Sequence, residues 1–380
     1  MTHFRPAGLA RERSAPAFAA SILLSCTLLW GASAHAQTTA PGYSLTPFAT
    51  GTPIGASSPD SIAISGGNVF IGYANNSDSA GGPGFSTIAQ YTTTGTLQKS
   101  YVMNGGNDGL RVDPSTGLVW VLQNQDGNSV LNVLNPVNGF MSQYGYAGNA
   151  HPDYSGYDDI VFSGGTAYLS ATNPADADGT VLYSASTTLP ATSASSPGLI
   201  QLTPVLKAGK LSDTDSLAIS PDGKSLLLDD QGGSGSRTDG NISSPSLTIV
   251  SVPGGQVSGV INLKDARGNA LSSDDTRFVP TGSKTMLIAD TSKNTIYALS
   301  GPFTGNGAYT ATKGNGFAGV GSLDLTSGVI SPVVSGLGSP HGLAFIPAAP
   351  EPSQAAALGI GLLGLAGLAV KARRRSNETV

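Results

Sequence analysis

The sequence has one cysteine, three glutamates and few charges of either sign. Cys26 is the only cysteine in 380 residues, so a product that lacks residue 26 has no disulfide, no thiolate nucleophile and no Cys-ligated zinc. The glutamates are Glu12, Glu351 and Glu378, all near the ends of the chain. Charged residues make up 11% of the chain and the formal net charge is -5, whereas nucleic-acid binding needs clustered Lys and Arg on a folded surface. Nucleic acid is therefore excluded as a partner.

The N-terminus has the three regions of a secretory signal in their usual order. Arg5, Arg11 and Arg13 precede an apolar run at 17–30, and a small-residue site, Ala34-His35-Ala36, follows. We expect residues 1–36 to be a signal peptide that is cleaved after Ala36. A retained membrane anchor and a lipoprotein site at Cys26 are the alternatives, although the run is short for a span and Cys26 lies inside it.

The C-terminus combines a short motif, an apolar stretch and a basic cluster. Residues 355–370 are apolar and would rise about 24 Å as a helix, slightly less than a bilayer core. The basic cluster after them would stay in the cytoplasm and leave the preceding chain outside. Pro350-Glu351-Pro352 precedes the stretch, and the basic cluster is Lys371, Arg373, Arg374 and Arg375.

This tail resembles the PEP-CTERM sorting signal. The resemblance covers about the last 30 residues, in which tripeptide, apolar stretch and basic cluster all match. It implies an exosortase as a partner: a membrane peptidase, linked to exopolysaccharide export, that cuts at the tripeptide. We therefore expect export through the inner membrane, transient anchoring by a C-terminal transmembrane helix, and release to the cell surface or beyond. A plain C-terminal anchor is the alternative, and it also places the body outside.

The body, residues 37–349, repeats a short unit, and such repeats decide a fold before any other signal. Each copy is a strand with period-2 alternation that ends in a turn at proline or glycine. Successive copies start 48, 50, 57, 59 and 67 residues apart. The copies begin at Asp60, Asp108, Asp158, Asp215, Asp274 and His341.

A second aliphatic strand follows each of the first five copies, at 69–73, 119–123, 167–171, 226–229 and 286–289. Third strands follow at 130–134, 181–184 and 247–252. No amphipathic helix of useful length interrupts the body. This spacing predicts an all-β fold, a β-propeller of four-stranded blades; a β-sandwich has no reason to repeat one signature so regularly.

The unit count favours six blades. The sixth copy ends at Pro347, so its blade must take outer strands from residues 41–58, where 43–49 is the clear candidate. Five blades with an additional strand are the alternative. The unit resembles the six-bladed NHL, lactonase and gluconolactonase-like propellers, most closely at Ser220-Pro221-Asp222-Gly223-Lys224 and at 340–345.

The starting residues of the six copies predict a ring at one mouth of the central channel, because innermost strands line that channel. Five crowded carboxylates must raise some pKa values or attract a cation such as Ca²⁺. The simpler interpretation is one Asp turn per blade, in which the side chain accepts a backbone N–H bond. His341 is either a base, a metal ligand or a histidine bonded to backbone.

Two functions follow from these observations. The first is a non-enzymatic surface or matrix protein whose propeller binds exopolysaccharide, a cation or an envelope partner, with no required cofactor. The second is a metal-dependent hydrolase or lactonase of the gluconolactonase type. The resemblance implies a metal held by Glu, Asn and Asp, and the absence of Glu from the body counts against that transfer.

Overall fold

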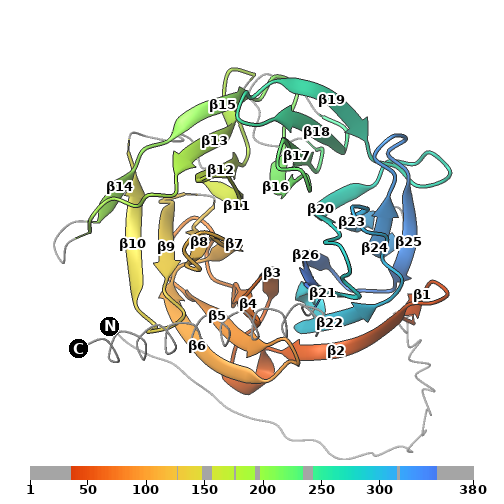
Figure 1. The fold of residues 1–380 in the computed structure, drawn as a ribbon, viewed down its shortest axis with the longest axis horizontal. Helices are drawn as coiled ribbons and strands as arrows, with labels where there is room; N and C mark the ends of the chain where they lie inside the picture. Colours follow the sequence, from red (N-terminus) through yellow and green to blue (C-terminus); the bar gives the residue numbers. More distant parts are fainter. Residues whose placement is uncertain are drawn as a thin grey trace, which may run out of the picture. The chain divides into compact units, whose positions relative to one another are not determined.

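The computed structural model describes residues 36–125, 127–147, 156–174, 177–192, 197–233, 243–314 and 317–348. These residues form an all-β propeller of six blades around a central channel (Figure 1). The two helices among them are 3-10 turns, η1 Thr52–Ile54 and η2 Thr291–Lys293. The predicted propeller and its six blades are therefore confirmed, and the five-bladed alternative is wrong.

Blades 1, 3 and 4 are antiparallel sheets of four strands, written here from the channel outward. Blade 1 is β3 Pro59–Ser65, β4 Asn68–Tyr73, β5 Phe85–Thr92 and β6 Leu97–Asn104. Blade 3 is β11 Tyr157–Ser163, β12 Thr166–Ala171, β13 Thr180–Ser186 and β15 Thr203–Lys207. Blade 4 is β16 Thr214–Ile219, β17 Ser225–Asp230, β18 Ser246–Ser251 and β19 Val257–Asn262.

Blade 2 has an additional short strand at its outer edge. It consists of β7 Asn107–Val112, β8 Val119–Gln123, β9 Val130–Leu134 and β10 Met141–Tyr146. The fifth strand, β14 Gly198–Ile200, pairs in parallel with β10, although the chain reaches it only after three strands of blade 3. This strand joins the outer edges of blades 2 and 3.

Blades 5 and 6 are interleaved along the chain. Blade 5 is β20 Ser272–Phe278, β23 Ala308–Gly314, β24 Phe317–Leu323 and β25 Ile330–Ser335, with β1 Thr38–Thr39 at its edge. Blade 6 is β26 Pro340–Ile346, β21 Thr285–Asp290, β22 Thr295–Ser300 and β2 Ser44–Thr50. After β20 the chain thus builds two strands of blade 6, returns for the rest of blade 5, and ends as the inner strand of blade 6.

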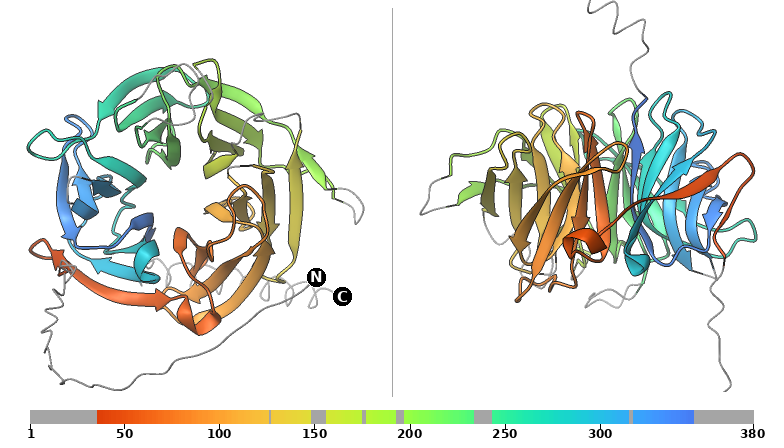
Figure 2. Two further views of the ribbon diagram at one scale, coloured as in Figure 1. Left: turned by 180° about the vertical axis from the view of Figure 1, so that it is seen from behind. Right: turned by 90° about the horizontal axis from the view of Figure 1, so that it is seen from below.

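This interleaving corrects one prediction and confirms another in part. The strand at 286–289 exists, but it pairs with β26 and not with β20 as its position in the sequence predicted. Residues 43–49 do supply an outer strand of blade 6, since β2 pairs with β22. The two middle strands come from the long stretch between Asp274 and His341. Both views of the ring show the N-terminal strand beside the C-terminal blades (Figures 1 and 2).

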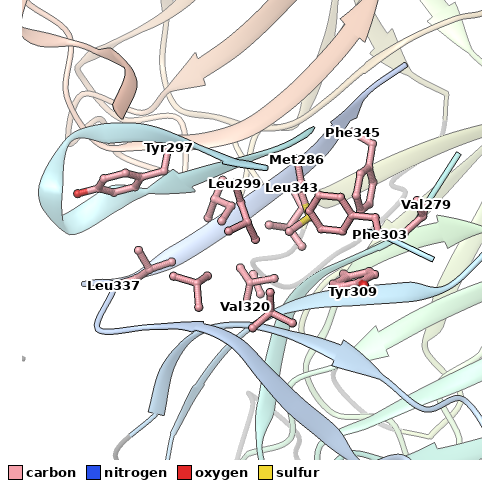
Figure 3. Close-up of a cluster of buried hydrophobic side chains, with 14 residues drawn as sticks. Val279, Met286, Tyr297, Leu299, Phe303, Tyr309, Val320, Leu337, Leu343 and Phe345 are labelled. Atoms are coloured by element: carbon pink, nitrogen blue, oxygen red, sulfur yellow. The ribbon is translucent and has the colours of Figure 1, made fainter. Parts of the chain in front are cut away.

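Aromatic and aliphatic side chains hold the interleaved blades together (Figure 3). Phe303 makes edge-to-face contacts with Tyr43, Tyr309 and Phe345 at centroid distances of 5.1 to 5.3 Å. Such contacts add about 0.5–1.5 kcal/mol each to the burial of the rings. Since Tyr43 lies just before β2, this cluster also fixes the N-terminal strand. Its buried members include Met286, Ile288, Leu299, Val320, Val334 and Leu343.

Within the described part of the chain, no helix has the length and apolar character needed to cross a bilayer. The predicted signal peptide at 1–36 lies outside the described residues except for Ala36, and the predicted tail at 350–380 lies outside them entirely.

Candidate functional site

All six residues of the predicted ring line one cavity at a mouth of the channel. The cavity has a volume of about 370 Å³, within the usual range for small-molecule sites. The buried members are Asp158 and Asp274, and the others are half-buried. The ring residues are Asp60, Asp108, Asp158, Asp215, Asp274 and His341.

A β-bulge places each ring residue. In every blade the pairing between the first and second strands shifts register at the ring position, for example between Pro59 and Ile62 and between Asn107 and Leu110. The same shift occurs in blades 3, 4, 5 and 6. A bulge adds one residue to a strand and redirects its side chain. The repeated bulge therefore leaves the following residues in the blade core and turns one side chain per blade into the mouth.

The residue after each ring residue packs against the next blade. A Cβ on Gly109 would lie 2.1 Å from the carbonyl oxygen of Asp158, and one on Gly342 would lie 2.2 Å from that of Asp60. Ser61 donates a short hydrogen bond to the carbonyl oxygen of Asp108. The Asp-Gly and His-Gly pairs of the sequence thus allow neighbouring inner strands to approach closely, a role that the Asp-turn interpretation had not included.

One half of the ring carries paired charges. His341 Nδ1 lies 3.1 Å from Asp60 Oδ1 and 2.9 Å from Asp274 Oδ2, while Lys313 Nζ lies 3.2 Å from Asp274 Oδ1. Burial lowers the pKa of His341, but the charges and hydrogen bonds of Asp274 and Asp60 outweigh it and raise the pKa to about 10. Burial also raises the pKa of Asp274, and the charges of His341 and Lys313 leave it below its usual value. We call Asp60, Asp274, His341 and Lys313 the balanced arc.

The other half of the ring is acidic. Burial, with the nearby charges of Asp60 and Asp158, raises the pKa of Asp108 well above its usual value. Burial, with the charges of Asp274 and Asp158, does the same for Asp215. Their close hydrogen-bonding partners include neutral amides: Gln231 donates to Asp215, and the Gln125 amide, with its nitrogen facing Asp108, donates at 2.7 and 3.1 Å. We call Asp108, Asp158 and Asp215 the acidic arc.

Next to the ring, two arginines and two aspartates from different blades form a cluster of ion pairs. Arg111 Nη2 lies 2.8 Å from Asp159 Oδ2, Arg277 Nη2 lies 3.3 Å from the same oxygen, and Arg277 makes a shorter contact with Asp275. Asp159 also accepts the backbone N–H of Leu217 at 2.9 Å. We call these four charged residues the plug. Its formal charges sum to zero.

The plug separates two different cavities. Arg111 and Arg277 line the polar mouth cavity and also a second pocket of about 270 Å³ whose walls include Val161, Phe162 and Leu217. The guanidinium groups of Arg111 and Arg277 therefore border both the mouth cavity and the second pocket. Sequence reasoning missed the plug, although Arg111 and Arg277 occupy the position where the other four units have Ala or Val.

A metal site is not preassembled in the ring as described. Among the described residues, no group of three or more His or Asp side chains is arranged to hold one metal ion. The carboxylates instead spread around a cavity of organic-ligand size. Ca²⁺ in this ring stays a prediction.

Comparisons with known proteins yield likenesses of shape only. No protein-family model and no curated protein match the chain. Similar solved structures include the outer-coat vertex of COPII on membranes (11% identity, TM-score 0.44, 77% of this chain and 65% of that one). A second is a putative 6-phosphogluconolactonase from Bacteroides uniformis (12% identity, TM-score 0.41, 75% of this chain and 73% of that one). A third is a glutaminyl cyclase from Myxococcus xanthus (12% identity, TM-score 0.39, 70% of this chain and 97% of that one). The propeller assignment therefore rests on the strand pairing of this chain.

Proposed function

We propose that this chain is an exported surface or matrix protein, processed at its C-terminal tail by an exosortase, and that its propeller is a binding module. The observation that supports binding is the mouth cavity, to which every blade contributes at least one polar side chain. A rigid six-bladed ring holds these side chains in fixed positions. Such preorganisation favours ligand binding because the side chains lose little conformational freedom when the ligand binds. Exopolysaccharide and envelope components are the proposed partners.

Blocking the cavity tests the binding role. Ala74 lines the mouth just after β4, so Ala74→Trp would place an indole ring in the cavity. We expect this variant to lose binding to exopolysaccharide and envelope fractions of the producing cells. Ser258→Trp, at the exposed outer strand β19, is the matched control. Equal binding by the two variants and the unmodified protein would show that the cavity is not the site.

Processing is tested at the sorting motif. Replacing Pro350 and Pro352 with alanine should leave an uncut precursor in the membrane fraction if an exosortase recognises the tripeptide. Immunoblots of membrane and medium fractions follow the two forms. Unchanged processing in a strain that has the peptidase would overturn the sorting proposal and leave the binding proposal intact.

The metal-dependent hydrolase is the second candidate, favoured by one observation: Asp108 lies within hydrogen-bonding reach of both Asp60 and Asp158. Crowded carboxylates of this kind can take up a hard cation. A ligand that binds only the native state must raise its stability. If Ca²⁺ leaves the melting temperature unchanged and the dialysed protein retains no metal, this candidate fails.

A further inference from the structure

The second pocket lies at the far end of the inner strands from the ring. The ring residues lie near the starts of these strands, whereas the lining of the second pocket includes the last residues of β7, β16 and β20, which are Val112, Ile219 and Phe278. β11 contributes Val161 and Phe162. The four strands follow one another around the channel (Figure 1), so the pocket occupies the other mouth on the side of blades 2 to 5.

The walls of this pocket are apolar and are fixed by the cores between the blades. Apart from two arginines, the residues that line it are Val, Leu, Ile, Ala, Phe and Pro. The ring of Phe162 contacts Trp120 edge to face at a centroid distance of 5.3 Å. Val112, Ile219 and Phe278 each pack in part against a buried hydrophobic cluster. Because these side chains are already ordered, they lose little conformational freedom when an apolar group binds.

The charged groups that face this pocket are positive. Arg111 and Arg277 line it, and among the described residues of its lining there is no carboxylate. Their partners Asp159 and Asp275 line the mouth cavity instead. Coulombic interactions weaken with distance, so the nearer guanidinium groups attract an anion in this pocket more strongly than the two carboxylates repel it. The plug is neutral as a whole, but it presents its positive side to the second pocket.

Each of the two arginines also keeps a hydrogen-bond donor. A guanidinium group has five N–H donors. The hydrogen bonds of Arg111 and Arg277 to Asp159 and to backbone carbonyl oxygens come from Nη1 and Nη2. Within the described part of the chain, neither Nε–H has a hydrogen-bond partner. The two side chains are 14% and 15% exposed, so part of each is accessible from the cavities that it lines.

We propose that the second pocket binds a small organic carboxylate. Its apolar body, about the size of one ring, fills the space between Phe162, Ile219 and Phe278, and its carboxylate faces Arg111 and Arg277. An apolar cavity of about 150 Å³ holds a benzene molecule, and this pocket has a volume of about 270 Å³. The site is separate from the mouth cavity, so the inference goes beyond the proposed function and does not depend on it.

Three probes test the two halves of the ligand. Saturation-transfer NMR titrations of the full-length chain at pH 7 compare benzoate with benzamide, which keeps the ring without the charge, and with acetate, which keeps the charge without the ring. We expect benzoate to bind at least tenfold more tightly than either of the other two. Equal binding of benzamide would remove the role of the arginines, and equal binding of acetate would remove the role of the apolar walls, so either result would overturn the proposal.

A matched pair of substitutions tests the charge without altering the plug. Ile219→Glu and Ile219→Gln place side chains of nearly equal size at the half-buried end of β16, and only the glutamate adds a negative charge to the pocket. We expect Ile219→Glu to bind benzoate at least tenfold more weakly than Ile219→Gln. Val112→Glu and Val112→Gln, at the half-buried end of β7, repeat the comparison if circular dichroism shows that an Ile219 variant does not fold.

A blocking substitution locates the ligand. Pro114 lines the pocket from an exposed turn, so Pro114→Trp should weaken benzoate binding at least tenfold, whereas Ala74→Trp in the mouth cavity should leave it unchanged. No benzoate binding, or equal binding by the Glu and Gln variants, would overturn the proposal. Loss of benzoate binding in Ala74→Trp but not in Pro114→Trp would also overturn it, because the ligand would then lie in the mouth cavity. Benzoate binding without exopolysaccharide or envelope binding would support this site and contradict only the proposed function.

Discussion

Replacing His341 with glutamine should change how the stability of the propeller depends on pH. His341 lies between Asp60 and Asp274, and its pKa rises from 6.5 to about 10. A folded-state pKa above the unfolded value means that the folded state binds the proton more tightly. The stabilisation is therefore fully present below pH 6.5 and is lost as pH rises through 10.

The magnitude follows from the size of the shift. A change of about 3.5 pKa units corresponds to about 5 kcal/mol as an upper limit, and the 23% exposure of the side chain lowers what we expect to about 2–4 kcal/mol. Glutamine keeps a hydrogen-bond donor but loses the charge. At pH 6 the His341→Gln variant should thus unfold at a lower urea concentration, and the difference should shrink as pH approaches 10.

Urea titrations of the full-length chain from pH 6 to 10, followed by the fluorescence of buried Trp120, measure this difference. Lys224→Gln, at an exposed turn, is the control for loss of one positive charge and should follow the unmodified protein. A difference between His341→Gln and the unmodified protein that stays constant from pH 6 to 10 would refute the reasoning. It would mean that His341 is neutral in the folded state.

Three further changes probe the charges and the packing around the channel. Burial raises the pKa of Asp229 to about 8, so the carboxylate destabilises the fold increasingly from pH 4 to 8, and Asp229→Asn should add about 1–4 kcal/mol at pH 7 in urea titrations. Arg277→Met leaves buried Asp275 without its closest cation and should cost about 3–5 kcal/mol. Gly109→Ala would force a Cβ against a backbone oxygen 2.1 Å away and should cost about 2 kcal/mol or more, measured as a lower melting temperature.

Each of these has an outcome that contradicts it. A stability gain of Asp229→Asn that is as large at pH 4 as at pH 8 would show that charge is not its cause. The double variant Arg277→Met with Asp275→Leu should recover much of the loss, because no buried charge stays unpaired; no recovery would mean that the arginine acts by packing alone. An unchanged melting temperature of Gly109→Ala would contradict the predicted clash, because Gly109 does not have a positive φ and the substitution adds no backbone strain of that kind.

The repeat in the sequence was enough to predict the propeller and the ring, for a physical reason. Each inner strand must present aliphatic residues to both neighbouring sheets, and each must begin at the same height in the channel. The starting residues at Asp60 and the equivalent positions therefore recur with the blade, and their convergence follows from the ring itself. Six copies of one signature predicted six strands around one channel.

Other features depend on pairing, which a single sequence does not record. The strand at 285–290 has the same aliphatic pattern whether it pairs with β20 or with β26, so its blade could not be predicted. The one available signal was length: the 67-residue interval between Asp274 and His341 is the longest, and it holds five strands. The bulges and the pairing of Arg111 with Asp159 likewise depend on register and on contacts across the channel.

The interleaving of blades 5 and 6 sets an order on folding. Blade 6 needs β2 from the start of the body, β21 and β22 from its last quarter, and β26 from its end. Its four-stranded sheet therefore cannot be complete until β26 has been synthesised. Contacts between such distant segments form slowly, because a long loop must close before they are made. If the chain is exported as proposed, it would close into a ring only after Ile346 has emerged, and the proposed sorting motif begins four residues further on.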